Sequence, residues 1–205
     1  DLVVRGNVVD GSGSYSDPRM HGRGSGIWPW GSERVLIEKN TFMHARGRAD
    51  SCGIHIDFNC RDVIVQYNLS IDNGGGFIEI LGNNYNCTYR YNISINDGHR
   101  VKGQPSNGPG TLNNGQSGHT FWISGYVGSS NPAFGPFNQY IYNNTIYVKS
   151  DIRAAWSVQD SNAGLLVANN IFYVEGDSVD ITSNSADNYT QSMVDRVVWK
   201  NNLYQ

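Results

Sequence analysis

Charged residues are scarce in this 205-residue chain, where they make up 16% of the positions. No apolar run approaches the roughly 20 residues of a membrane span, and a net charge of −3 offers no basic field for nucleic acid. Asparagine and glycine each occur 24 times, and aromatic residues reach 12%. This composition suits turns and strands and disfavours long helices. We therefore expect neither a membrane nor a nucleic acid as a partner.

Cysteine is also rare, with three residues, at Cys52, Cys60 and Cys87. Their spacing matches no zinc signature, and both a disulfide plus a free thiol and three buried thiols are compatible with it. No glycine-rich loop follows a strand and opens a helix, so no nucleotide site is predicted. No Ser–His–Asp order stands out either.

A short phrase that ends on asparagine returns along the chain, as in "VLIEKN", "VIVQYN" and "VVWKNN". The asparagines that mark it are Asn7, Asn40, Asn68, Asn92, Asn144, Asn170 and Asn202. Successive positions differ by 33, 28, 24, 52, 26 and 32 residues, where 52 is either two periods or one unit carrying a long excursion. A recurring unit of this length, built from short alternating strands, is typical of a solenoid.

The phrases alternate at period 2, which argues against helical repeats, and the spacing of leucine-rich repeats is absent. The pattern from Leu2 to Tyr204 resembles the right-handed parallel β-helix superfamily with the pectate-lyase-like fold. We therefore predict one all-β domain over 1–205, a right-handed parallel β-helix of about seven to eight rungs with long loops in 97–138. Its rungs should stack about 4.8 Å apart, with the asparagines forming a ladder.

The resemblance implies a carbohydrate-active protein, because the superfamily includes polysaccharide lyases, glycoside hydrolases, epimerases and phage tailspikes. The chain starts and stops in mid-phrase without a capping helix. Open ends of a β-stack invite edge pairing, so we expect a fragment of a longer protein, or a chain capped by a partner or by oligomerisation.

The alternation also predicts which side chains face outward. The first and third residues after each asparagine are mostly apolar, as in Met43 and Ile71, and are expected to face the core. The fourth residues, His44, Asp72 and Asn96, are expected to stack outward on three successive rungs.

A second strand follows in each rung. "GIHIDF" places His55 and Asp57 outside, and "GFIEIL" places Glu79 outside. Matching Ile56 to Ile78 stacks Asp57 on Glu79. Aromatic and imidazole side chains from other rungs are expected near the same face, namely Trp28, Trp30, His119 and Trp122. We interpret this face as the floor of a cleft that binds a polysaccharide.

Two carboxylates on adjacent rungs suit glycoside hydrolysis, in which one group acts as acid and the other as nucleophile or base. We assign these roles to Asp57 and Glu79, with His44, His55 and Asp72 in support and no cofactor or metal. The remaining side chains are predicted to bind substrate: Trp28, Trp30, Asn96, His119, Trp122, Arg100 and Lys102.

Two alternatives stay open. A lyase would remove a proton from a uronic acid polymer with Arg100 or Lys102 and neutralise the substrate with Ca²⁺ held by Asp72, Glu79 and Asp97. A non-catalytic adhesin, phage fibre or carbohydrate-binding surface would leave the outward acids as solvated surface. The long loops in 97–138 would form a wall of a cleft, which favours an enzyme. We expect the protein to be secreted and extracellular, or periplasmic.

Overall fold

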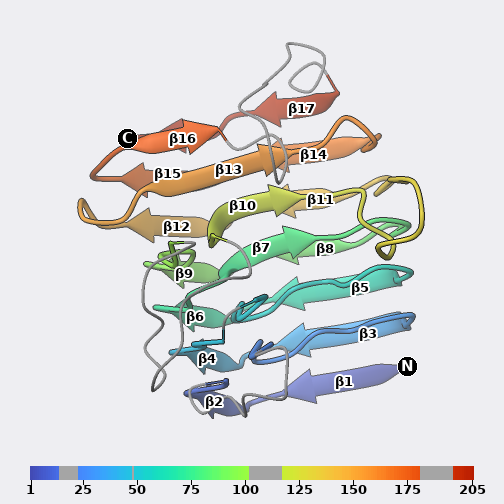
Figure 1. Ribbon diagram of the computed structural model, residues 1–205, viewed down its shortest axis with the longest axis horizontal. Coiled ribbons are helices and arrows are strands. Elements are labelled where there is room, and N and C mark those ends of the chain that lie inside the picture. The colour runs from blue at the N-terminus through green and yellow to red at the C-terminus, as the bar shows by residue number, and fades with distance from the viewer. Residues whose placement is uncertain (14–22, 48, 102–116, 181–195) are drawn as a thin grey trace.

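The computed structural model describes residues 1–13, 23–47, 49–101, 117–180 and 196–205 as a stack of three parallel sheets (Figure 1). The first sheet contains β1 (Leu2–Arg5), β3 (Glu33–Glu38), β5 (Arg61–Gln66), β8 (Thr88–Arg90), β11 (Tyr140–Tyr142), β14 (Leu165–Ala168) and β17 (Val197–Lys200). The second sheet contains β2 (Val8–Asp10), β4 (Thr41–Met43), β6 (Leu69–Ile71), β9 (Ile93–Ile95), β12 (Thr145–Val148), β15 (Ile171–Val174) and β18 (Leu203–Tyr204).

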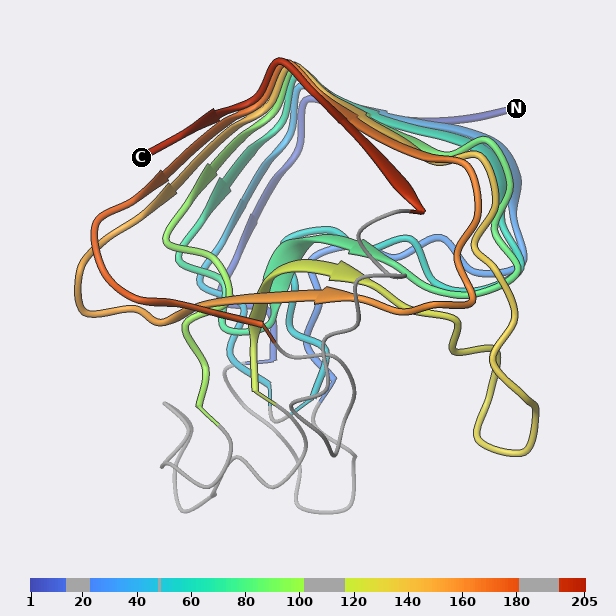
Figure 2. The ribbon, with the colours of Figure 1, turned by 90° about the horizontal axis from the view of Figure 1, so that it is seen from above.

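The third sheet is shorter and contains β7 (Gly76–Ile80), β10 (His119–Ile123), β13 (Ala154–Val158) and β16 (Ser178–Asp180). Figure 2 looks along the stack and shows the three sheets as the sides of one coil around a shared interior. The chain is thus a right-handed parallel β-helix of seven rungs, as predicted. In the part of the chain that the structure describes, no helix is long and apolar enough to span a membrane.

The predicted asparagine ladder is confirmed. The backbone N–H and the side-chain amide of Asn68 both donate to Oδ1 of Asn92, at 2.9 and 3.1 Å. The same pair of bonds joins every consecutive rung from Asn7 to Asn202. The residue before each asparagine has a positive φ, such as 54° at Tyr67, which turns the chain sharply from the first sheet into the second.

This turn corrects the expected facing of the second sheet. Because the asparagine points inward, alternation puts the next residue outside and the second residue inside. The buried residues of this sheet are therefore Phe42, Ser70, Ser94, Ile146, Val148 and Phe172. The positions expected in the core, such as Met43 and Ile71, are only half-buried, and Tyr173 is exposed.

The 52-residue interval is one rung with a long excursion, since β8 pairs with β11 and β9 pairs with β12. The interior is apolar and continuous across the sheets, with Ile54, Ile56, Ile78 and Ile80 fully buried. All three cysteines are buried free thiols, so the alternative of a disulfide is wrong.

Candidate functional site

The register beside the third sheet differs from the predicted one by two residues. Ile56 pairs with Ile80, and Cys52 pairs with Gly76. Glu79 therefore lies beside His55 on the next rung, and the expected stacking of Asp57 on Glu79 is wrong. A shift of two residues leaves the alternation of faces unchanged, so alternation alone could not reveal it. The expected outward exposure of His55 and Glu79 is also wrong, since both side chains are buried.

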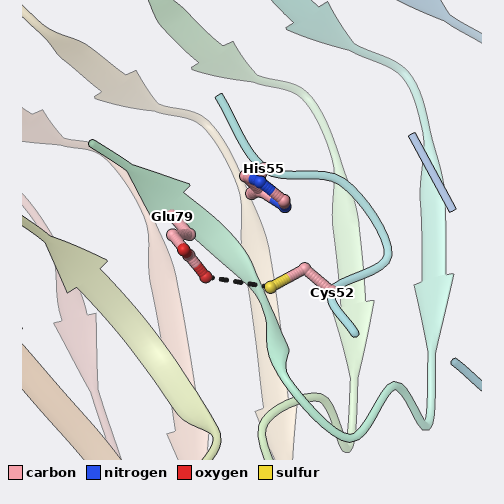
Figure 3. Close-up of side chains that lie close together, drawn as sticks. All are labelled: Cys52, His55 and Glu79. Carbon is pink, nitrogen blue, oxygen red and sulfur yellow. Dashed lines mark hydrogen bonds between the residues drawn. The ribbon is translucent and has the colours of Figure 1, made fainter. Parts of the chain in front are cut away.

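The new neighbours form a compact group of three side chains from two rungs (Figure 3). The Cys52 thiol donates to Oε2 of Glu79 at 2.9 Å. One ligand atom from each of Cys52, His55 and Glu79 lies within 4.8 Å of the other two. Their exposed fractions are 0%, 2% and 3%. We call these three residues the thiol cluster.

Two further side-chain oxygens lie near the two ring nitrogens of His55. Ser25 Oγ lies 3.0 Å from His55 Nδ1, and a carboxylate oxygen of Asp57 lies 3.9 Å from Nε2. The Cys52 backbone N–H donates to the same Ser25 hydroxyl at 3.1 Å, which ties the cluster to the preceding rung. Trp28 stacks on the imidazole with ring centroids 6.0 Å apart. The ring is thus held by Ser25 at one edge, lies near the Asp57 carboxylate at the other, and is covered on one face.

Burial and neighbouring acids together decide the protonation of this group. Burial raises the pKa of Glu79, and Asp50 and Asp57 add to that effect, while His55 opposes it. Burial lowers the pKa of His55, but the acids around it outweigh burial and raise that pKa overall. Burial, and then Glu79, raise the pKa of the Cys52 thiol well above its usual value. The Cys52 thiol therefore holds its proton at neutral pH.

A pocket of about 380 Å³ opens beside the cluster and is lined by Asp50, Glu79, Trp122, Tyr126 and Gln159 among others. The Asp50 side chain is 26% exposed and lies 3.5 Å from Arg23. The Asp57 side chain is 17% exposed. Three carboxyl groups thus act electrostatically on His55, and the two aspartates are the more accessible ones.

Asp50 was not among the predicted site residues. Both Asp50 and Ser51 have positive φ values, of 48° and 63°, so this segment leaves the regular alternation that guided the prediction. The thiol cluster was missed for a related reason, because Cys52 and Glu79 come from different rungs and meet only in the observed register. Asp50 lies only five residues before His55 in the sequence, but nothing in the sequence distinguishes it from the other aspartates.

The predicted aromatic residues lie in two environments. Trp28 and Trp30 are exposed, and Trp30 makes an edge contact with Phe58. Trp122 is buried and stacks on His119 with ring centroids 4.4 Å apart. Burial lowers the pKa of His119 to about 4, so this imidazole is neutral at neutral pH. Of the predicted indoles, Trp28 and Trp30 offer an open surface.

The predicted stack of His44, Asp72 and Asn96 is present, but it lies at the ends of β4, β6 and β9 rather than on the third sheet. All three residues have positive φ values and turn the chain out of the second sheet. Asp72 forms an ion pair with Arg46 and lies 3.3 Å from His99 Nε2. This group is therefore separate in the fold from the thiol cluster.

The residues of the lyase interpretation are brought together only in part, since Arg100 interacts electrostatically with Glu79. Arg100 is buried and donates to the backbone oxygens of Gly47 and Asp50 at 2.9 Å, while Lys102 lies outside the described residues. Asp97 is buried against Asn73 and Ser94. Within the described ranges, the expected Ca²⁺ ligands Asp72, Glu79 and Asp97 form no common group. That expectation is wrong.

Comparison with known proteins gives one informative similarity. No family model matches the chain, and no solved structure matches it. A lacto-N-biosidase of Bifidobacterium longum subsp. longum is 30% identical over 185 residues, which covers 83% of this chain and 10% of that protein. The chain thus spans about a tenth of the length of the curated relative it matches. It is a parallel β-helix with distant similarity to part of a carbohydrate-active enzyme.

Proposed function

We propose that this chain is part of a glycoside hydrolase that acts on an extracellular carbohydrate. The observation that carries the proposal is the convergence of Asp50, Asp57 and Glu79 on His55, beside a pocket and next to exposed indoles. The partial similarity to a lacto-N-biosidase supports the same class of reaction.

Glycoside hydrolysis needs two carboxyl groups that reach the substrate from either side of the scissile bond. One protonates the leaving oxygen, and the other attacks the sugar or activates water. Asp57 keeps its predicted role as one of the pair. We propose Asp50 as its partner, because both side chains are partly exposed whereas Glu79 is buried and bound to the Cys52 thiol. Glu79, the partner predicted from the sequence, borders the same pocket and is the second candidate.

The exposed rings of Trp28 and Trp30 supply the apolar contact in this proposal. An indole face suits the apolar face of a pyranose ring, and both rings project beside the segment that carries His55 and Asp57. An extracellular glycan as substrate implies a secreted protein, which remains a proposal together with the substrate.

The test is a panel of oligosaccharides and polysaccharides, with reducing ends and ultraviolet absorbance read in parallel. We expect reducing ends without an unsaturated product, and a loss of at least about 100-fold in kcat for Asp57→Asn and Asp50→Asn. Asp160→Asn, at an exposed turn, is the matched control and should retain activity. If Asp50→Asn is active and Glu79→Gln is not, the predicted Asp57–Glu79 pair is correct instead.

Two results would overturn the proposal. Absorbance of an unsaturated sugar would identify a lyase. Binding of glycans without any cleavage, by a folded wild-type protein, would identify a carbohydrate-binding β-helix.

A further inference from the structure

The thiol cluster places three different metal-binding groups at one buried point. A thiol, an imidazole and a carboxyl group are the three ligand types that Zn²⁺ takes in proteins. Cys52 and His55 come from one rung and Glu79 from β7 of the next, so the β-helix fold itself holds the three together. No cluster of surface acids is involved, because all three side chains are buried.

The distances are close to those that one metal ion requires. Tetrahedral bonds of about 2.0 to 2.3 Å put neighbouring ligand atoms about 3.3 to 3.6 Å apart. The three ligand atoms lie within 4.8 Å of one another, and Cys52 Sγ lies 2.9 Å from Glu79 Oε2. A tetrahedral site requires that contact to widen by about half an ångström and the imidazole to move closer to the other two ligands.

The surroundings also fit a metal site. A histidine that binds a metal usually gives its other ring nitrogen to an oxygen partner. Here Ser25 Oγ lies within hydrogen-bond distance of His55 Nδ1, at 3.0 Å, whereas the Asp57 carboxylate is 3.9 Å from Nε2 and leaves that nitrogen available to the ion. Glu79 borders the adjoining pocket, through which water can reach a fourth coordination position.

We propose that Cys52, His55 and Glu79 bind one thiophilic divalent cation of the Zn²⁺ type. Metal ligands must be deprotonated, so binding displaces the proton of the Cys52 thiol and any proton on the coordinating atoms of His55 and Glu79, and these protons leave to solvent. Metal binding does not depend on the proposed hydrolase activity. One consequence does rest on it: a bound ion would fix the His55 ring, and with it the position of Asp57.

The experiment uses the 205-residue chain, stripped of metal with a chelator and dialysed against Zn²⁺ and, separately, Co²⁺. We expect the protein to bind one equivalent of either metal. The Co²⁺ form should also show a thiolate-to-cobalt charge-transfer band in its absorption spectrum. Cys52→Ser should abolish the band and weaken binding at least about 100-fold. Cys87→Ser, at another buried free thiol, is the matched control and should retain both. Glu79→Gln keeps the shape of the side chain and should weaken binding at least about tenfold.

Wild-type protein that retains no Zn²⁺ and shows no charge-transfer band would overturn the proposal, whatever the variants do. A band that survives in Cys52→Ser but disappears in Cys87→Ser would also overturn it. The outcome is separable from catalysis, since Asp50→Asn should lose hydrolysis while keeping the metal. If the wild-type protein cleaves none of the glycans, the Co²⁺ spectrum still tests metal binding independently.

Discussion

Asp97 is a buried carboxyl group whose charge costs folding free energy, and replacing it with asparagine should stabilise the protein above neutral pH. It ends a short polar ladder, in which the backbone N–H and side-chain amide of Asn73 donate to its Oδ1 at 2.9 and 2.8 Å. Ser94 Oγ donates to its Oδ2 at 2.6 Å. Burial outweighs these hydrogen bonds and raises the Asp97 pKa from 3.8 to about 6.

The direction of the pH effect follows from proton binding. The folded protein holds the Asp97 proton more tightly than the unfolded chain, so the stabilisation is fully present below about pH 4. It is lost as pH rises through about 6. A difference of about 2 pKa units corresponds to about 3 kcal/mol. An asparagine at this position accepts the same bonds from Asn73 and carries no charge at any pH.

The assay is urea unfolding of wild type and Asp97→Asn at pH 4 and pH 8. The stability difference between the two proteins should shift by about 3 kcal/mol in favour of the variant on going to pH 8. Asp160→Asn, which changes an exposed carboxyl group, should show no such shift. A difference that is independent of pH, or that favours wild type more strongly at pH 8, would refute the reasoning.

Three further predictions concern the ladder, the buried imidazole and the indole surface. Asn92→Ala should destabilise the protein by about 3 kcal/mol, because it leaves buried donors of Asn68 unpaired. Asn7→Ala should cost about 1 kcal/mol, because the exposed Asn7 side chain only donates and its loss leaves no buried donor unpaired; urea unfolding of both variants compares them. The His119 pKa of about 4 means that the unfolded chain binds this proton first as pH falls. Wild type should therefore lose about 3 kcal/mol of stability between pH 7 and pH 4 through this group, and His119→Phe should lose correspondingly less over the same range; an unchanged pH slope would contradict this. Trp30→Ala should raise KM about fivefold with kcat retained, measured on whichever glycan is cleaved, and an unchanged KM would exclude Trp30 from the binding surface.

Much of the fold was predictable because one asparagine occurs at the same position in every rung of the β-helix. A side chain that hydrogen-bonds to the equivalent residue of the next rung must recur at the same position in each rung. The repeat of Asn40, Asn68 and Asn92 therefore indicates stacked rungs. Period 2 also placed His55 and Asp57 on the same face of their segment, but it did not reveal that His55 is buried. The facing of the second sheet was less accessible, since whether the asparagine points inward depends on the positive φ of the residue before it.

The site was predictable only in part. Alternation shows on which face a residue lies, but it cannot distinguish registers that differ by two residues, and the neighbour of Glu79 depends on that difference. Asp50 lies in an irregular segment where alternation carries no information. The thiol cluster needed both the true register and the depth of burial, neither of which a repeat pattern specifies.

The most direct test of the account is the release of reducing ends from a glycan panel by wild type, Asp57→Asn and the control Asp160→Asn. We predict release by wild type and the control, and a loss of at least about 100-fold in Asp57→Asn with the variant still folded. Cleavage at the wild-type rate by a folded Asp57→Asn would contradict the assignment of the site at His55 and its acids.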